Sequence, residues 1–276
     1  MTEEHPIRNF RMEVSFDGTA YHGWQRQPNG ITVQEVIETK LSRLFNTERV
    51  KIQGSSRTDT GVHAQGMAVS FEAPESPYIP DWKIKKAMNR LLPQDIRIRS
   101  VEYAPPEFNA RFSARGKAYI YVVNTGDLNP FTSRWSHYQP DFTQLDAVRE
   151  AMKFLEGEHD FSAFTIELVP EKDHVRTLYK LEVKTFGPLV CLCFVGNGFL
   201  YKMVRSITGA LLEVGRGRMP AGRVAEMLAA KDRSMAKDTA PACGLFLMKV
   251  FYEEDEWRSF DFDCPPFFMQ IGRAHV

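Results

Sequence analysis

Hydrophobic and polar residues alternate along this chain in two periods, one typical of helices and one typical of strands. Apolar side chains recur at intervals of three and four through residues 32–45, which predicts a helix with one buried face. Thr32 and Glu35 form the capping-box pattern that opens such a helix. The same reasoning predicts helices at 81–92, 143–155 (ended by Gly157), 200–214 and 221–230, and strands at 10–16, 50–53, 67–72, 96–103, 117–124, 178–185, 189–195 and 245–252.

The order of these segments predicts an α+β fold. Each half of the chain places helices between strands, so we expect two ferredoxin-like α+β halves that form a mixed, largely antiparallel sheet with helices packed on it. Pro105 and Pro106 interrupt both helix and ladder hydrogen bonding, which makes them the expected seam between halves at 8–104 and 105–252. An acidic tail, 253–276, follows.

Charge is unevenly distributed along the chain, although its net charge is zero. Residues 253–276 contain six acids and two arginines, which leaves the remainder modestly basic and compatible with an RNA partner. The last six residues, 271–276, match a translated sequencing adapter, and we exclude them from fold reasoning.

Composition also bounds location and cofactors. No apolar run approaches the roughly 18 residues that a membrane helix needs, and the start of the chain is polar, so we expect a cytoplasmic protein without a membrane partner. The four cysteines include no Cys-x-x-Cys pair and the histidines show no helical His-x-x-x-His spacing. We therefore expect reduced structural thiols, with Cys191 and Cys193 on one strand face, and no metal site.

The most informative string is Gly-Ser-Ser-Arg-Thr-Asp-Thr-Gly-Val-His-Ala at residues 54–64. Asp59 lies among small turn-forming residues, with Gly54 and Gly61 able to take positive φ, so its carboxylate is expected on a loop. Arg57 is close enough in sequence to keep Asp59 ionised or to reach a substrate phosphate. For an isolated Arg-x-Asp, a surface turn with an incidental ion pair would be the better interpretation.

Three further strings contain candidate functional residues. Residues 16–27 form a loop of aromatic and amide side chains that suits either an RNA surface or a packed loop. Tyr119 and Tyr121 share one face of a strand, where they belong to the core or stack on a base. Arg205 lies within an apolar helix and needs a carboxylate partner, which the pattern of the helix does not identify.

These strings, in this order, resemble those of the TruA family of tRNA pseudouridine synthases. The matching segments are 17–25, 57–64, 108–121, 176–177, 198–215 and 240–245. The chain departs from the family pattern at Thr60, where many members have alanine, and at Ser55 and Ser56, where glycine or alanine is usual.

The resemblance implies an isomerase that converts uridine to pseudouridine at positions 38–40 in the tRNA anticodon stem-loop, without a cofactor. It implies a central RNA-binding cleft and a homodimer. Asp59 would be the nucleophile or base, with attack at C1′, attack at C6 and proton removal from the sugar all open. Arg205 would be its counter-ion, Tyr119 the uracil contact and Arg57 the residue that assists base flipping. The remaining RNA contacts would be Phe108, Asn109, Arg111, Phe112 and Arg176.

Two other functions compete with this interpretation. Asp59-Thr60-Gly61 is also the core triplet of aspartic proteases, but Arg57 would oppose the shared proton that their carboxylate pair requires. A non-catalytic RNA-binding module explains the basic and aromatic loops. It gives no reason for a loop carboxylate beside RNA phosphates.

Overall fold

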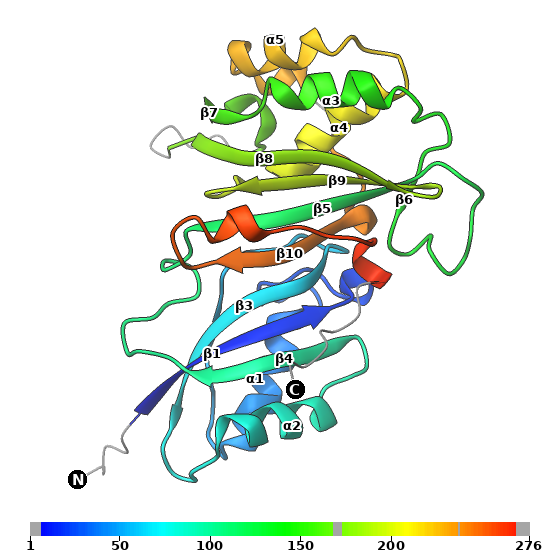
Figure 1. The fold of residues 1–276 in the computed structure, drawn as a ribbon. Coiled ribbons are helices and arrows are strands. Elements are labelled where there is room, and N and C mark those ends of the chain that lie inside the picture. Colours follow the sequence, from blue (N-terminus) through cyan, green and yellow to red (C-terminus); the bar gives the residue numbers. More distant parts are fainter. Residues whose placement is uncertain (1–6, 168–172, 237, 269–276) are drawn as a thin grey trace. The chain divides into compact units, whose positions relative to one another are not determined.

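The expected alternation of strands and helices is present in the computed structural model, which describes residues 7–167, 173–236 and 238–268 (Figure 1). The terminal residues 271–276 lie outside this range. The chain forms two compact units, one made of the residues up to Arg115 together with Leu247–Tyr252, the other of Gly116–Phe246 and the segment from Glu253. The division therefore falls after Arg115 rather than at Pro105 and Pro106.

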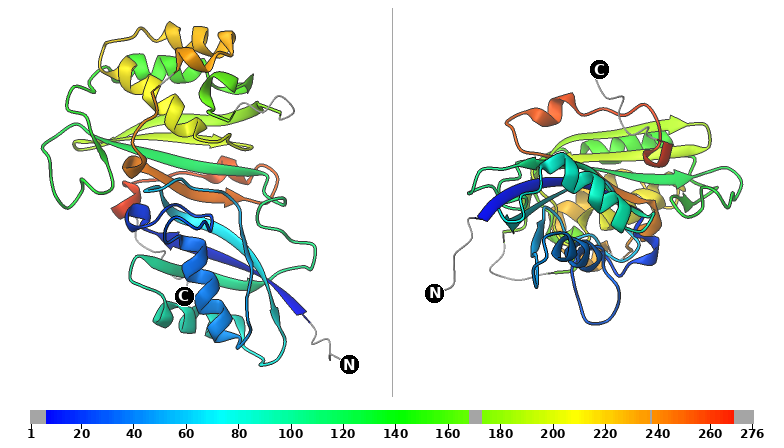
Figure 2. Two further views of the ribbon diagram at one scale, coloured as in Figure 1. Left: turned by 180° about the vertical axis from the view of Figure 1, so that it is seen from behind. Right: turned by 90° about the horizontal axis from the view of Figure 1, so that it is seen from below.

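The first unit is an antiparallel sheet covered by helices. Its strands are β1 (Ile7–Phe16), β2 (Ile52–Gly54), β3 (His63–Pro74) and β4 (Ile96–Tyr103), and β10 (Leu245–Phe251) follows β3 in the sheet order. Alternate residues of β1, beginning at Phe10, are completely or almost completely buried. Helices α1 (Val33–Leu44) and α2 (Asp81–Leu91) lie on one face of the sheet (Figure 2).

The second unit repeats the theme. Strands β5 (Gly116–Asn124), β9 (Leu189–Gly196), β8 (Val175–Phe186) and β7 (Gly157–Asp160) are antiparallel neighbours in that order, and β6 (His137–Tyr138) pairs with β5 in parallel. Every residue of β9 is buried, as expected of a central strand. The helices are α3 (Leu145–Lys153), α4 (Met203–Gly215) and α5 (Gly222–Ala230). The expected α+β class with a mixed, largely antiparallel sheet is confirmed.

Short 3₁₀ turns complete the described structure. They are Gly18–Ala20, Ser162–Phe164, Arg233–Met235, Ala242–Gly244, Glu256–Ser259 and Pro266–Phe268.

Two expected helix boundaries are wrong, each for a local backbone reason. The third helix ends at Lys153, and Gly157, which we expected to terminate it, instead opens β7 with a φ of +93°. The fourth helix begins at Met203 rather than at residue 200, because Lys202 adopts a left-handed φ of +58° that a helix cannot contain. Its expected end is confirmed, since Gly217 takes a φ of +70° just past Gly215.

The acidic tail is packed against the second unit as far as it is described. The Lys180 ammonium donates to the carbonyl of Phe260 at 3.2 Å, and Lys184 pairs with Asp261. The Trp257 ring stacks on Tyr179 with centroids 4.8 Å apart. The segment 253–268 thus contributes to the packing of this unit, which its polar sequence does not reveal.

Candidate active site

Asp59 lies on the loop of residues 55–62 that joins β2 to β3. The loop leaves the sheet at Ser55, whose amide donates to the Ala68 carbonyl at 2.9 Å, and it closes where the Val62 amide donates to the Asp59 carbonyl at 3.1 Å. Gly61 takes the expected positive φ, +78°. Asp59 is neither fully buried nor fully exposed on this loop.

Gly54 has a different role from the expected one. It lies in β2 with ordinary strand geometry, and a Cβ there would come within 2.5 Å of the Trp24 indole nitrogen. Glycine is therefore required because the Trp24 ring occupies the space of a side chain, not because of a positive φ.

A second loop, residues 17–24, contacts the backbone of the Asp59 loop. The Trp24 amide donates to the Thr58 carbonyl at 3.1 Å, and the Gly18 amide donates to Nδ1 of His63 at 3.1 Å. A Cβ at Gly23 would lie 2.5 Å from the Thr58 carbonyl oxygen, and one at Gly18 would lie 2.0 Å from that of Val62. The two backbones are in direct contact, so the glycines of residues 17–24 are needed to position Asp59.

The aromatic residues of this second loop are core residues rather than an RNA surface. Trp24 is 1% exposed and Tyr21 is 5% exposed. The Tyr21 hydroxyl donates to Asp95 at 2.7 Å, and burial together with this carboxylate raises the pKa of Tyr21. Of the two interpretations of this string, the packed loop is the one that the structure supports.

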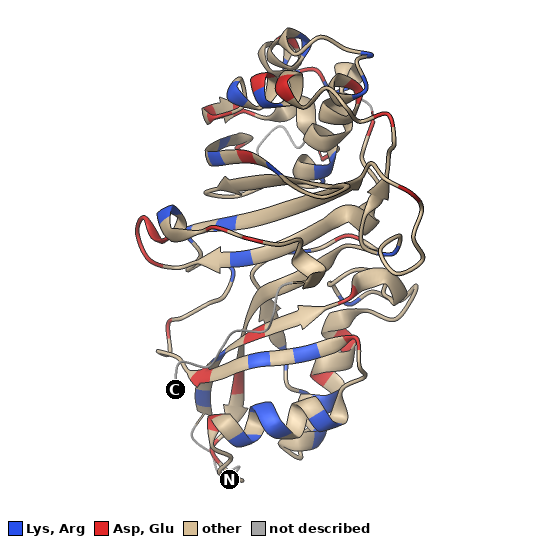
Figure 3. Cartoon of the chain, turned by 45° about the vertical axis from the view of Figure 1, so that its right-hand side comes forward, with Lys and Arg blue, Asp and Glu red and all other residues tan. Residues whose placement is uncertain are grey.

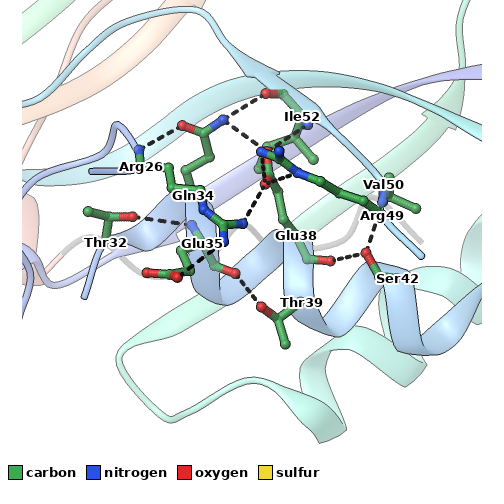
Figure 4. A network of polar contacts seen from close by, with 10 residues as sticks. All are labelled: Arg26, Thr32, Gln34, Glu35, Glu38, Thr39, Ser42, Arg49, Val50 and Ile52. Carbon is green, nitrogen blue, oxygen red and sulfur yellow. Dashed lines mark hydrogen bonds and ion pairs between the residues drawn. The ribbon is translucent and has the colours of Figure 1, made fainter. Parts of the chain in front are cut away.

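A buried polar network on α1 anchors both loops (Figure 4). Glu38, whose side chain is 2% exposed, accepts from the Ile52 amide at 3.2 Å and from Arg49 at 2.9 Å, and it pairs with Arg26 at 3.5 Å. Gln34 donates to Glu38 at 3.0 Å and accepts from the Arg26 amide at 3.0 Å. Ile52 begins β2, which leads into the Asp59 loop, whereas Arg26 follows the supporting loop. Sequence reasoning missed this network, because Glu38 at a helical polar position looks like a solvated residue.

Residues 108–112, which follow Pro105 and Pro106, include some side chains that stabilise the fold and others that are exposed. The Asn109 carboxamide oxygen accepts from the amides of Arg111 and Phe112, at 2.9 and 3.1 Å, and so shapes the turn. Phe108 packs against Tyr252 with centroids 5.1 Å apart. Phe112 is 77% exposed, with the Arg111 guanidinium 5.4 Å from its ring. Arg111 and Phe112 are therefore exposed at the surface, while Asn109 mainly serves the fold.

The two tyrosines of β5 differ in their surroundings. Tyr121 is completely buried and its hydroxyl donates to the Pro241 carbonyl at 2.9 Å, so burial raises its pKa well above the usual value. Tyr119 is 8% exposed and meets the Phe199 ring edge-on, with centroids 5.0 Å apart. Tyr121 is therefore a core residue, and Tyr119 lies at the boundary of the core with an aromatic neighbour.

Arg205 and Arg176 occupy the second unit as well. On α4, Arg205 Nε donates to the Ala240 carbonyl at 2.8 Å, and the Ala240 amide returns a bond to the Arg205 carbonyl at 3.0 Å, which fixes the arginine stem. Arg176 lines a surface cavity of about 290 Å³ that Tyr201 and His174 also line. Asp59 and Arg57 belong to the first unit, so the predicted residues come from both units.

The described residues lack a cluster of metal-ligating side chains. No group of three or more His, Cys, Asp or Glu side chains among them could hold a metal ion. No helix in the described part of the chain has the length and apolar character to cross a membrane. Cys191 and Cys193 are free and lie on β9, where burial raises the pKa of each thiol to about 12, as expected of structural thiols.

Comparison with known proteins decides among the competing functions. The tRNA pseudouridine synthase family profile matches residues 12–113 and 151–253, which include the Asp59 loop, the supporting loop and α4. The chain belongs to this family. It is therefore an isomerase that converts uridine to pseudouridine in tRNA, and the protease and binding-module alternatives are excluded.

Individual relatives agree with this assignment. The chain is 42% identical to tRNA pseudouridine synthase A of Geobacillus kaustophilus over 88% of its own length and 93% of that protein. It is 43% identical to the protein of the same name from Chlamydia muridarum, over 87% and 91% of the two chains. Among solved structures, a Cbf5-Nop10-Gar1 complex matches 86% of this chain and 47% of that one, at 16% identity and a TM-score of 0.34.

Proposed function

We propose that this pseudouridine synthase modifies uridines at positions 38–40 of the tRNA anticodon stem-loop, with Asp59 as nucleophile or base. The observation that supports the role of Asp59 is its partly exposed position on a loop that a second, glycine-rich loop holds by backbone contacts. The reaction detaches uracil from C1′ and rejoins it through C5, so it needs one fixed carboxylate and no added reactant.

The test of Asp59 is its replacement by asparagine, which keeps the shape and removes the charge. We expect Asp59→Asn to lower kcat on the order of 10⁴-fold or more, while tRNA affinity changes little. The measurement is release of the uracil C5 hydrogen, which must leave when C5 becomes the glycosidic carbon. Thr60→Ala is the matched control, because Thr60 is the exposed neighbour on the same loop. Substantial turnover by Asp59→Asn would refute the assignment.

Arg205 is proposed to act as the counter-charge of Asp59. Its side chain is fixed through Nε, which donates to the Ala240 carbonyl, and a guanidinium on the largely buried helix α4 calls for a carboxylate partner. Arg205→Leu should lower both activity and stability, and a double-mutant cycle with Asp59→Asn should give a coupling energy of about 1 kcal/mol or more. Additive effects of the two substitutions would separate Arg205 from Asp59.

Tyr119 and Arg57 are proposed to handle the extruded nucleotide. Tyr119 has an aromatic neighbour in Phe199 and suits contact with the freed uracil, whereas the exposed Arg57 suits stabilisation of the space that the base leaves. Tyr119→Leu should therefore lower kcat, while Arg57→Ala should mainly penalise a duplexed target and less so an unpaired one. Equal losses by Arg57→Ala on both substrates would contradict base flipping.

Additional RNA contacts are proposed for residues that the structure leaves at or near the surface. These are Phe108, Asn109, Arg111, Phe112 and Arg176. The exposed Arg111 and Phe112 should contribute most, because the Asn109 side chain already bonds the loop backbone. We also propose a homodimer that works in the cytoplasm and binds tRNA in a central cleft. Sedimentation of the purified protein, alone and with tRNA, tests the assembly.

The substrate position is tested by mapping pseudouridine in bulk tRNA from cells lacking this gene, with and without its restoration. We expect restoration at positions 38–40 across tRNAs of different sequence. Restoration at position 55 or in ribosomal RNA alone would reject the position while leaving the isomerase chemistry intact.

A further inference from the structure

Helix α2 carries an exposed row of cations on the outside of the first unit. Lys83, Lys85, Lys86 and Arg90 are all exposed, while Ile84 and the next turn of the same helix face the core. Residues 81–99 contain six basic side chains and two carboxylates, in a chain whose net charge is zero. Figure 3 shows the resulting concentration of basic residues along α2 and on the neighbouring strand β4.

The charges on α2 differ from that of Arg99 on β4, which pairs with Glu13 at 3.2 Å. Within the described residues, Lys85, Lys86 and Arg90 make no ion pair. The two carboxylates of the segment are engaged locally, since Asp81 accepts from a backbone amide at 2.7 Å and Asp95 accepts from a tyrosine hydroxyl at 2.7 Å. The α2 row therefore presents a positive potential to solvent, which attracts an anionic partner.

Exposed aromatic rings accompany this charge. Trp82 is 59% exposed and Tyr78 is 69% exposed. The Lys83 ammonium lies 5.3 Å from the Trp82 ring, whereas the cation beside Tyr78 is Arg8, whose side chain is only 13% exposed and pairs with Glu75 at 4.0 Å. Cations interleaved with exposed rings suit a nucleic acid, whose phosphates bind the charges and whose sugars and bases contact the rings.

A lipid surface fits the same helix poorly. Membrane-surface helices insert an apolar face, but Ile84 and Met88 on α2 are completely buried in the unit. The helix has 11 residues and its outer face is charged, so little apolar surface is left to insert. The charge therefore favours a polyanion in water over a bilayer.

We infer that the α2 surface, defined here as Trp82, Lys83, Lys85, Lys86 and Arg90, binds the sugar-phosphate backbone of tRNA away from the nucleotide being modified. This deepens the proposed function and rests on tRNA being the substrate. Phosphate contacts position an RNA without reading its sequence, which suits an enzyme that acts on many tRNAs. The surface thus contributes affinity and orientation, and the chemistry stays with the Asp59 loop.

The test removes three charges that have no acidic partner. The variant is Lys85→Gln/Lys86→Gln/Arg90→Gln. Each lost phosphate contact should make the slope of the logarithm of the tRNA binding constant against the logarithm of salt concentration shallower by roughly 0.7 to 0.9. We expect a total reduction of about 2, a KM near 0.15 M salt raised about 10-fold, and kcat at saturating tRNA within about twofold of the wild type.

The matched control is Arg149→Gln/Lys153→Gln/Arg258→Gln, which removes the same charge from exposed positions of the second unit. It should leave the salt dependence within about 0.5 of the wild type. Equal changes in both triple variants would show a general charge effect and overturn the inference, as would no change in the α2 variant. A changed sedimentation coefficient, or loss of binding to anionic phospholipid vesicles, would instead assign the surface to a second copy or to lipid.

Failure of the α2 surface to bind tRNA can be distinguished from failure of the proposed modification at positions 38–40. Binding is measured directly by titration of labelled tRNA, and turnover by release of the C5 hydrogen. If the wild type binds tRNA with an α2-dependent salt slope and modifies other positions, the surface stands and the proposed position fails. If positions 38–40 are modified and the slope is unaffected, the proposed position stands and the surface fails.

Discussion

Glu38 offers the sharpest test of how the fold holds the Asp59 loop. It is a carboxylate with a 2% exposed side chain, and it accepts from the Ile52 amide, from Gln34 and from Arg49 (Figure 4). Glu38→Leu replaces the carboxylate with an apolar side chain of similar size and removes every hydrogen-bond acceptor. Glu38→Gln keeps the shape and one acceptor while removing the charge.

The expected magnitude follows from what each variant leaves unpaired. Loss of the acceptor for the buried Ile52 amide costs about 1 to 3 kcal/mol. The side chains of Arg26 and Arg49 are each 45% exposed, so water can solvate their guanidinium groups and replace much of the interaction lost with Glu38. Gln34 still donates to the Ile52 carbonyl, at 3.1 Å. We therefore expect Glu38→Leu to lower the free energy of unfolding by about 3 kcal/mol and Glu38→Gln by about 1 kcal/mol.

The assay is urea unfolding followed by circular dichroism, with kcat measured below the unfolding transition. An unchanged slope of free energy against urea would show that the variants differ in stability rather than in unfolded-state compactness. Because the chain runs from Ile52 through β2 into the Asp59 loop, the fraction of Glu38→Leu that remains folded should also turn over more slowly.

Glu35→Gln is the matched control on the same helix. Glu35 pairs with Arg26 at 3.6 Å, but its side chain is 35% exposed, so its replacement should cost less than about 1 kcal/mol. If Glu38→Leu were no less stable than Glu35→Gln, the network would be a surface feature, and the reasoning from burial would be wrong.

Three further predictions concern other parts of the chain. Gly23→Ala should destabilise the protein by about 2 kcal/mol in thermal unfolding and lower kcat, because the new Cβ would collide with the Asp59 loop. Gly187→Ala is the control, because Gly187 also has a positive φ but a Cβ there would meet nothing within 4 Å, so it should lower the stability by a smaller amount. Truncation after residue 263 should lower the Tm, because it removes Phe267, whose ring stacks on Trp135 with centroids 5.7 Å apart; an unchanged Tm would contradict this packing. Both cysteines of β9 should resist iodoacetamide at about pH 8 until the protein is denatured, because burial raises the pKa of Cys191 and of its neighbour to about 12; rapid labelling seen by mass spectrometry of the native protein would refute their burial.

The sequence by itself determined the elements and the family. Helix α1 is predicted because its signals are local, namely the Thr32 cap and apolar residues at helical spacing. The string at residues 57–64 indicates the reaction class for a similar reason, since its residues are contiguous. In both cases the helix and the family string are recognised from neighbouring residues alone, without any distant residue.

Only the tertiary structure decided what each neighbour of that string does. Gly54 is required by the indole of Trp24, and Gly18 and Gly23 are required by carbonyls of the Asp59 loop, although none of these pairs is close in sequence. Glu38 occupies an ordinary polar helical position until Arg49 and the Ile52 amide surround it. Such contacts depend on which surfaces the fold brings together, and no local pattern encodes them. The sequence therefore identifies the Asp59 loop, but it does not identify the residues that hold this loop in place.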